Sequence, residues 1–219
     1  SERLFAAGRH RHADEMAGLV RITVPDLPDL PDEHAVLREL LTALQAYPKL
    51  VLDWRRDTVR LNVVQEQIDI GVRIGHLADS RLIARKIGET CEKIVMAADL
   101  LRRLGKPKDF ADLQKNYPLA AVLNHNNGRA DTWYINENLQ FTPAKPHFVG
   151  SHIHNALQAA LAGNAVSQQL DWMVAPYLLN GELVELFAEV PKIRWPVSIY
   201  RPQRVVTPMR VKVVFDLLA

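Results

Sequence analysis

The sequence predicts an α/β protein with mainly parallel sheets, and three observations support this class. Apolar and polar residues alternate through Ile68–Gly75, which is the period-two pattern of a strand with one buried face. Two earlier segments, Leu19–Val24 and Leu50–Trp54, alternate in the same way, and a segment with helical spacing follows each of them. The order strand, helix, strand, helix, strand is typical of parallel strands joined by crossover helices.

The segments between these strands have distinct signals. Three prolines in Pro25–Asp32 forbid a helix or a central strand there, so a loop follows the first strand. Asp32 can cap the helix predicted for Glu33–Leu44, and Pro48 ends it. A second helix is predicted for Thr58–Gln67. The first helix has two adjacent apolar rows, which consist of Val36, Leu37, Leu40, Leu41 and Leu44.

Short strands and helices continue to the end of the chain. The predicted strands are Leu82–Ile87, Lys93–Ala97, Leu119–Leu123, Thr132–Ile135, His147–Val149 and Val197–Tyr200. The predicted helices are Asp99–Leu104, Ser151–Ala162 with a serine cap, Asp171–Leu179, and a last helix with Thr207 as cap and Pro208 at its first position. Val211, Val214, Phe215 and Leu218 form the apolar stripe of that last helix.

Composition excludes several function classes. Lys and Arg number 27 against 25 Asp and Glu, so the formal charge of +2 is far from that of a free-standing nucleic-acid binder. The single cysteine, Cys91, allows no internal disulfide and favours a reducing cytoplasm. No apolar run reaches the roughly 18 residues of a membrane span, and the first residues lack the apolar region of a signal peptide. No membrane partner is therefore expected.

Several segments of the chain resemble the same known protein family. The strand Ile68–Gly75 and the following Asp79–Gly88 are the most informative, and the other phrases are Leu19–Pro25, Ala46–Leu52, Ile94–Ala97 with Leu104–Pro107, Ala156–Gly163, Asn180–Leu186 and Pro208–Leu218. In this order they resemble the effector-binding domain of LysR-type transcriptional regulators. The agreement of many weak signals over most of the chain makes the resemblance informative.

The resemblance implies a two-lobed periplasmic-binding-protein type 2 fold, in which each lobe is a mainly parallel sheet flanked by helices. Two crossover segments join the lobes. Lobe I is expected to hold residues 18–90 and 192–219, and lobe II residues 91–191. Residues 1–17 would end a linker helix leading to a winged helix-turn-helix domain that is absent from this chain.

The same resemblance implies a small-molecule effector held between the lobes, and no cofactor. It also implies self-association as a dimer or tetramer, through the helix Glu33–Leu44 of one chain and lobe II of another. DNA would be bound only through the absent N-terminal domain. The expected function is therefore effector sensing for a bacterial transcription factor, without catalysis.

Two segments depart from the family pattern. Asn164–Trp172 stands where the family has a glycine-rich strand, so the backbone could be shifted there. Asp26 stands where the family has a serine or threonine facing the effector, which argues against a carboxylate effector because two anions would be opposed. Arg56 at the next strand end could pair with Asp26.

Candidate site residues follow from the rule that ligands bind beyond the carboxyl ends of parallel strands. Arg56 could hold a carboxylate or phosphate, or could simply be a solvated arginine paired with Asp57 or Asp26. Ser151 starts a helix, where N–H groups favour an anion, or is a plain cap. The predicted effector-binding residues are Asp26, Leu27, Arg56, Asp57, Ile74, Gly75, His76, Asn124, Ser151, His152 and Tyr200.

Other readings of the sequence are weaker. The pairs His10 with His12 and His152 with His154 lack further ligands at a familiar spacing, so no metal is expected. Cys91 has no resolving partner for redox sensing, and structural burial is expected instead. A periplasmic solute-binding protein of the same fold is the main rival and would need an export signal. An enzyme ranks last, because no acid, base and nucleophile converge.

Overall fold

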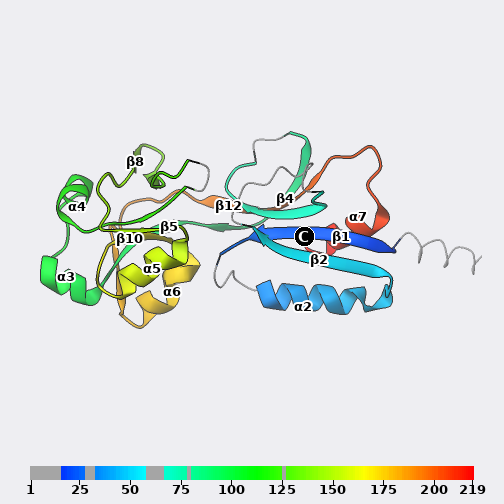
Figure 1. Cartoon of the computed structure of the whole chain (residues 1–219), viewed down its shortest axis with the longest axis horizontal. Helices are drawn as coiled ribbons and strands as arrows, with labels where there is room; N and C mark the ends of the chain where they lie inside the picture. The colour runs from blue at the N-terminus through cyan, green and yellow to red at the C-terminus, as the bar shows by residue number, and fades with distance from the viewer. Residues whose placement is uncertain (1–15, 28–32, 58–66, 78–79, 125–126) are drawn as a thin grey trace, which may run out of the picture. The chain divides into compact units, whose positions relative to one another are not determined.

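The computed structural model describes residues 16–27, 33–57, 67–77, 80–124 and 127–219 (Figure 1). They fall into two compact units. The first takes the described residues of Ser1–Asp26, Pro31–Glu89 and Pro196–Ala219, and the second takes those of Leu27–Leu30 and Thr90–Trp195. The helix predicted for Thr58–Gln67 and most of the predicted linker segment lie outside the described residues.

A five-stranded sheet forms the centre of the first unit, with strand order β2-β1-β3-β12-β4. The central strand β1 pairs in parallel with both β2 and β3, and β12 runs antiparallel to β3. The alternation of strands and helices thus gave the correct direction of the first three strands. The strands are β1 (Gly18–Pro25), β2 (Leu50–Asp57), β3 (Ile70–Ile74), β4 (Leu82–Thr90) and β12 (Trp195–Pro202).

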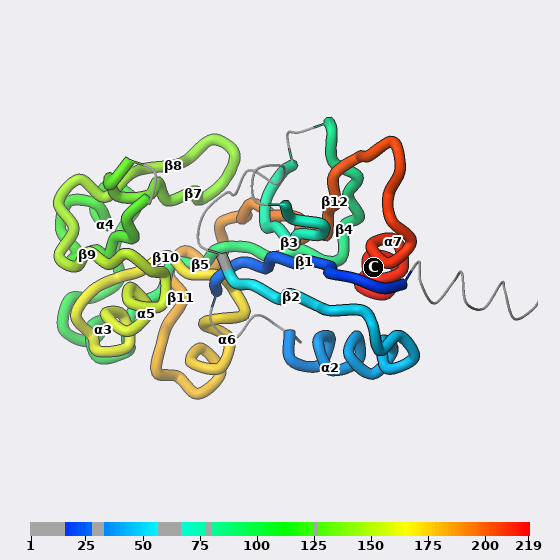
Figure 2. Tube along the Cα trace, turned by 45° about the vertical axis from the view of Figure 1, so that its right-hand side comes forward, coloured from blue at the N-terminus to red at the C-terminus, as the bar shows by residue number. Residues whose placement is uncertain are grey.

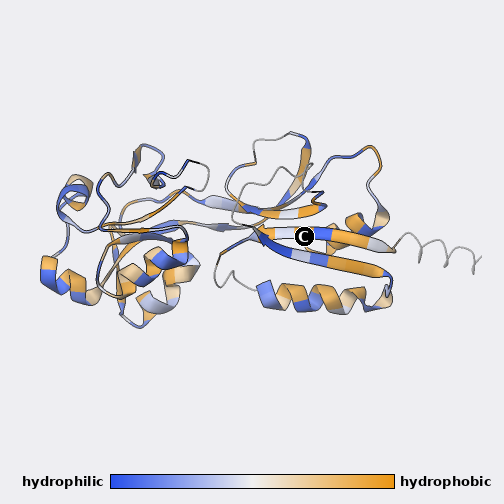
Figure 3. Ribbon diagram, viewed as in Figure 1, coloured by the Kyte–Doolittle hydropathy of each residue, from blue (hydrophilic) through white to orange (hydrophobic). Residues whose placement is uncertain are grey.

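Two helices pack on this sheet, α2 (Glu33–Ala43) and α7 (Met209–Leu217). Figure 2 shows α2 running along β2, with α7 beside the start of β1. The alternate apolar residues of β1 are almost fully buried against both helices, and Figure 3 shows the same apolar bands along the strands. Each such side chain contributes roughly 1.5–3 kcal/mol through burial. This core includes Val20, Ile22, Val24, Leu40, Leu44, Val211, Val214 and Phe215.

The second unit has a mixed arrangement of strands. Its three-stranded sheet has the order β10-β5-β11, and both pairings are antiparallel. A separate pair, β6 with β9, is parallel, and β7 with β8 is antiparallel. The strands are β5 (Glu92–Ala97), β6 (Ala120–Val122), β7 (Trp133–Asn136), β8 (Leu139–Phe141), β9 (Phe148–Gly150), β10 (Ser167–Leu170) and β11 (Leu183–Leu186).

The expectation of a mainly parallel sheet in each lobe is therefore corrected for the second unit. The partners of β5 come from about 70–90 residues further along the chain, and local periodicity carries no information about such a pairing direction. The helices of this unit are α3 (Ala98–Leu104), α4 (Phe110–Asn116), α5 (Ile153–Leu161) and α6 (Asp171–Leu179). Small residues let α5 approach β6 closely, namely Ala120, Ala156, Ala159 and Ala165.

Most predicted elements are confirmed, and four were missed, namely α4, β8, β10 and β11. The helix α4 starts with an Asp109 cap that accepts a hydrogen bond from the Asp112 N–H at 2.8 Å. The strands β8 and β10 are short and polar, so neither shows the expected alternation. At the last helix, Pro208 takes the cap position, while the Thr207 hydroxyl lies 3.2 Å from Nη1 of Arg201. The predicted Thr207 cap is thus wrong, because Arg201 engages that hydroxyl.

Candidate functional site

The carboxyl ends of β1, β2 and β3 meet at one edge of the first unit's sheet, because these three strands are parallel. Pro25 lies opposite Asp57 and Val24 lies opposite Arg56, so Asp26 follows directly beyond this register. The end of β3 brings Ile74, with Gly75 and His76 after it. The structure therefore brings the predicted first-lobe residues to the same edge.

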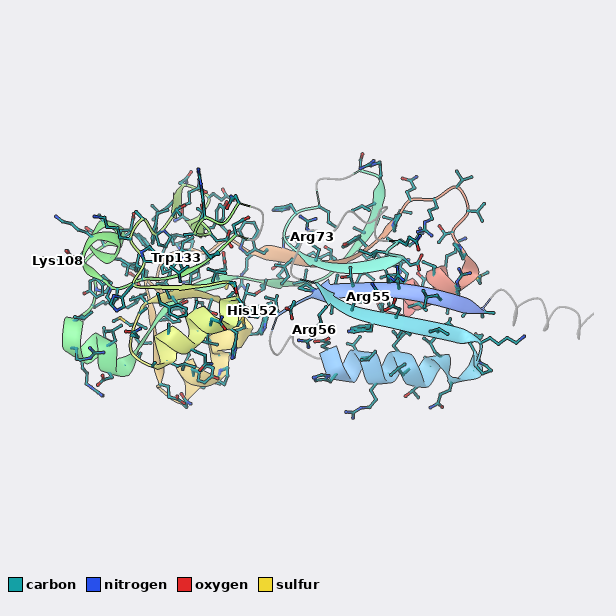
Figure 4. All side chains as sticks on the ribbon, viewed as in Figure 1. Arg55, Arg56, Arg73, Lys108, Trp133 and His152 are labelled. Atoms are coloured by element: carbon teal, nitrogen blue, oxygen red, sulfur yellow. The ribbon has the colours of Figure 1, made fainter. Side chains whose placement is uncertain are left out.

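Arg56 is tied to an acidic residue that was not among its expected partners. Its guanidinium forms an ion pair with Glu33, the first residue of α2, and Figure 4 shows Arg56 between the end of β2 and the start of α2. The Glu33 side chain is only 5% exposed and also accepts a hydrogen bond from the Trp54 indole at 3.2 Å. A carboxylate in the first turn of a helix is favoured by the helix dipole. The pair between Asp26 and Arg56 stays a prediction.

This partner changes the expected cost of losing Arg56. A partly exposed ion pair contributes only about 0–1 kcal/mol. Removing Arg56 would, however, leave the buried carboxylate of Glu33 with the neutral Trp54 indole as its side-chain donor among the described residues. An uncompensated buried charge is much more costly than a broken surface pair. Arg56 itself is 38% exposed, so water can reach the site, and we expect a loss of about 1–2 kcal/mol.

Tyr200 lies inside the first unit. It is buried, and it faces Gly71 across the pairing of β12 with β3. A Cβ atom built on Gly71 would lie 2.3 Å from Cζ of Tyr200, so the ring occupies the space that any side chain at Gly71 would need. The ring is therefore a core element, and a role of Tyr200 in ligand binding stays a prediction.

In the second unit, Asn124 and Ser151 lie beyond the ends of two paired parallel strands. Val122 of β6 is opposite Gly150 of β9, and the Leu123 N–H donates to the Gly150 carbonyl at 2.8 Å. The amide of Asn124 donates to Asp131 at 2.9 Å, which fixes that side chain at the base of a turn. Ser151 is exposed. This edge thus places one fixed amide near one accessible hydroxyl.

The cap of α5 is His152 instead of the predicted Ser151. Nδ1 of His152 accepts a hydrogen bond from the His154 N–H at 3.2 Å, so the ring satisfies one of the free N–H groups at the helix start. This arrangement requires that Nδ1 of His152 carry no proton. Because His152 is the cap, the Ser151 hydroxyl is available for another partner.

The polar strand β10 is a feature that sequence reasoning missed. Ser167, Gln168 and Gln169 are all buried, although the sequence only marked them as a departure from a glycine-rich pattern. Gln169 donates to the Ser167 hydroxyl at 2.7 Å and to the Ile153 carbonyl at the start of α5. Its buried Oε1 atom has no hydrogen-bond partner among the described residues. Three polar residues between apolar neighbours were the available signal.

A recess of about 410 Å³ in the second unit holds a network of charged groups. Glu185 accepts from Lys93 at 2.6 Å and from Lys192 at 2.8 Å. Burial acts to raise the pKa of Glu185, but the hydrogen bonds from Lys192 and Lys93 outweigh it and lower the pKa. These ion pairs hold the loop after β11, because Lys192 also contacts the carbonyl of Phe187 at 3.3 Å.

Cys91 borders the same recess and is buried, as expected. Its thiol donates to a carboxylate oxygen of Asp171 at 3.5 Å. Burial, followed by the negative charge of Asp171, raises the pKa of the Cys91 thiol above its ordinary value. A thiol that stays protonated is a poor nucleophile, which fits a structural role.

Metal ligands do not gather in the described part of the chain. No group of three or more His, Cys, Asp or Glu side chains there is arranged to hold an ion. His152 and His154 are joined by the capping hydrogen bond described above, and His10 with His12 lies outside the described residues. No helix among the described residues is long and apolar enough to span a membrane.

Two units of mixed α/β architecture, with polar side chains at the edges of parallel strands, define a domain of the substrate-binding class. Residues 13–219 match the model of the LysR substrate binding domain. The chain therefore belongs to the LysR substrate-binding domain family, and the resemblance stated from the sequence is confirmed.

Curated relatives agree with this assignment. A transcriptional regulator of the helix-turn-helix type from Xanthomonas campestris is 26% identical over 145 residues, which is 65% of this chain and 42% of the relative. The regulator CrgA from Neisseria meningitidis is 26% identical over 147 residues, covering 66% of this chain and 48% of CrgA. This chain thus spans less than half the length of these two relatives.

Solved structures show the same fold. The regulatory domain of CrgA from Neisseria meningitidis has a TM-score of 0.68 at 21% identity, over 92% of this chain and 97% of that domain. The full-length virulence activator AphB of Vibrio cholerae has a TM-score of 0.74 at 18% identity, over 99% of this chain and 73% of AphB. The fold is therefore of the type 2 periplasmic-binding-protein class, as predicted.

Proposed function

We propose that this domain binds a small-molecule effector and passes the signal to the DNA-binding part of a bacterial transcriptional regulator. The match to the LysR substrate-binding domain over residues 13–219 carries this proposal. The relatives named above are described as transcriptional regulators, which supports sensing in the cytoplasm over transport in the periplasm and over catalysis. Effector binding would favour one conformation of the regulator over another.

The proposed lobes keep the boundaries expected from the sequence, with residues 18–90 and 192–219 in lobe I and residues 91–191 in lobe II. The two compact units support this division. We place effector contacts at the strand edges of each lobe. The residues proposed are Asp26, Leu27, Arg56, Asp57, Ile74, Gly75 and His76 in lobe I, and Asn124, Ser151 and His152 in lobe II, with Tyr200 beside them.

The proposal is tested with the intact regulator. A thermal-shift screen of metabolites should first identify a compound that raises the melting temperature, because a ligand bound only by the folded state stabilises it. Ser151→Ala should then weaken that compound about five- to tenfold, through loss of one hydrogen bond of about 1 kcal/mol. The melting temperature without ligand should not change, since Ser151 is exposed and does not cap α5.

Two matched control variants separate the loss of a site residue from the loss of a similar residue elsewhere. Ser80→Ala removes an exposed hydroxyl of the first unit that lies outside the proposed site, and it should leave affinity unchanged. Arg56→Gln should weaken effector binding, while Arg55→Gln should not, because successive residues of a strand point to opposite faces of the sheet and Arg55 pairs with Asp53 on its own face. Equal affinity in wild type, Ser151→Ala and Arg56→Gln would contradict the proposed site.

We further propose self-association through α2. Its buried residue Leu40 belongs to the core, yet Leu41 on the same helix is 50% exposed and Val36 is 39% exposed. These apolar side chains support an interface next to the edge strand β2, where Val51 is also exposed. The mode expected from the family resemblance is side-by-side contact with lobe II of another chain.

Leu41→Glu should shift the chain from dimer or tetramer toward monomer at tens of micromolar, since a charge would be buried in the interface. Sedimentation velocity measures this shift. Leu217→Glu is the matched control, because Leu217 is also helical and is 49% exposed. A wild-type chain that sediments only as monomer, or an unchanged distribution for Leu41→Glu, would contradict the interface.

A further inference from the structure

The first unit carries an arginine-lined groove at the end of the sheet opposite to the proposed effector edge. Leu19 and Arg21 come from the first half of β1, and Asp69 directly precedes β3. Arg204 follows β12, and Arg210 lies in the first turn of α7. Four separate segments thus surround a space of about 500 Å³.

Two of the three arginines are held in place by carboxylates. Nε of Arg21 donates to Asp53 at 2.8 Å, and its side chain is only 19% exposed. Nη1 of Arg204 donates to Asp69 at 3.2 Å. Asp69 also accepts a hydrogen bond from the backbone N–H of Arg21 at 3.1 Å. The groove wall is therefore ordered before any ligand binds, which lowers the entropic cost of binding.

Arg210 differs from the other two arginines. Its Nε atom donates to the Leu19 carbonyl at 3.1 Å, which orients the guanidinium against the start of β1. Among the described residues no carboxylate lies within ion-pair distance of Arg210. The remaining N–H groups of its planar fork can still donate to a ligand. The groove thus contains an oriented guanidinium without a charged partner in the described part of the chain.

The charges that face this groove are unbalanced. Three arginines line it, and Asp69 is the one carboxylate among the lining residues. Asp53 also pairs with Arg21 from outside the lining, so the remaining positive charge is that of Arg210, and it favours an anionic ligand. Guanidinium groups match the oxygens of a phosphate in geometry and charge, and arginine is preferred wherever such oxyanions are held by forked hydrogen bonds.

We propose that this groove is a binding site for a small molecule that carries a dianionic phosphate group, with Arg210 as its principal ligand. Arg21 and Arg204 supply the surrounding positive charge. The space of about 500 Å³ is larger than a phosphate ion alone needs, so a phosphate ester fits as well as the free ion. Leu19 lies seven residues before Asp26, and a strand rises about 3.3 Å per residue. The groove is thus roughly 20 Å from the proposed effector edge, and its assignment does not depend on that site.

The test uses the whole 219-residue chain and isothermal titration with inorganic phosphate at constant ionic strength. Wild type should bind phosphate in the micromolar to millimolar range, and Arg210→Gln should weaken binding at least tenfold. Arg210→Lys keeps the charge but loses the fork, so it should give an intermediate affinity. Arg102→Gln is the control, because Arg102 lies on α3 in the other unit and pairs with Asp99. It should bind as wild type does.

Further arms distinguish the source and chemistry of the ligand. If a phosphate ester is the natural ligand, glycerol 3-phosphate should bind at least as tightly as inorganic phosphate. If the free ion is the natural ligand, glycerol 3-phosphate should bind less tightly. Both outcomes support the phosphate site. Succinate, a dianion of different shape, should bind more weakly than phosphate. Succinate binding with no phosphate binding would overturn the phosphate assignment. Equal phosphate affinity in wild type, Arg210→Gln and Arg210→Lys would overturn the site itself.

Discussion

Replacing Gly71 by alanine should lower the free energy of unfolding by about 3 kcal/mol, because the new methyl group has no space. A Cβ atom at Gly71 would lie 2.3 Å from Cζ and 2.6 Å from Cε1 of Tyr200. The aromatic ring is rigid and is packed inside the first unit, so the ring or the sheet must move. Urea unfolding followed by tryptophan fluorescence measures the loss.

A double-mutant cycle isolates this steric effect. In a Tyr200→Leu background the smaller side chain frees the space, so Gly71→Ala should cost less than about 1 kcal/mol there. Gly88→Ala in β4 is the control, because a Cβ atom at Gly88 would meet nothing within 4 Å and the φ angle there is not positive. That change should be neutral or slightly stabilising. Additive effects of Gly71→Ala and Tyr200→Leu would contradict the proposed contact.

The stability of the protein should fall as pH rises from about 4.5 to about 7, through the titration of Glu92. Burial at the start of β5 raises the pKa of Glu92 from its ordinary value of 4.5 to about 7. The hydrogen bond from the Trp195 indole, at 3.3 Å, opposes this rise, while the negative charge of Asp131 adds to it. The folded state therefore holds a proton that the unfolded state releases.

The direction and size of this effect follow from linkage. Between the two pKa values the folded state binds more protons, so the free energy of unfolding decreases as pH increases. The stability that comes from keeping Glu92 protonated in the folded state is fully present below about pH 4.5. It is lost as the pH rises through about 7. The difference between the pKa values of Glu92 in the unfolded and folded states corresponds to about 2–3 kcal/mol in the free energy of unfolding.

Glu92→Gln should remove this pH dependence and raise the free energy of unfolding at pH 8 by up to about 2–3 kcal/mol. The amide oxygen of glutamine can still accept from the Trp195 indole, so the local geometry should be kept. Glu189→Gln, an exposed change in the same unit, should leave the pH profile as in wild type. Identical pH profiles for wild type and Glu92→Gln would show that Glu92 titrates normally.

Part of the candidate site could be predicted from residue order alone. Asp26, Asp57 and Gly75 each follow a predicted strand, and parallel strands bring their carboxyl ends to one edge. The Glu33 partner of Arg56 could not be found in this way. This pair joins the start of α2 to the end of β2, and no local sequence pattern encodes which residues of two separate elements meet. Likewise, the His152 cap replaces Ser151 because the exact start of α5 depends on side-chain hydrogen bonds, which periodicity cannot resolve.

The sequence by itself determined the α/β class, the order of most strands and helices, and the family. Alternation at β1 and β3 and the apolar stripe of α7 directly reflect which face of each element is buried. Only the tertiary structure decided the antiparallel pairing of β5 with β10 and β11, the burial of the polar strand β10, and the convergence of Arg21, Arg204 and Arg210. These features join residues that are far apart in the chain, so they arise from long-range packing, whereas periodicity records only the local environment of each element.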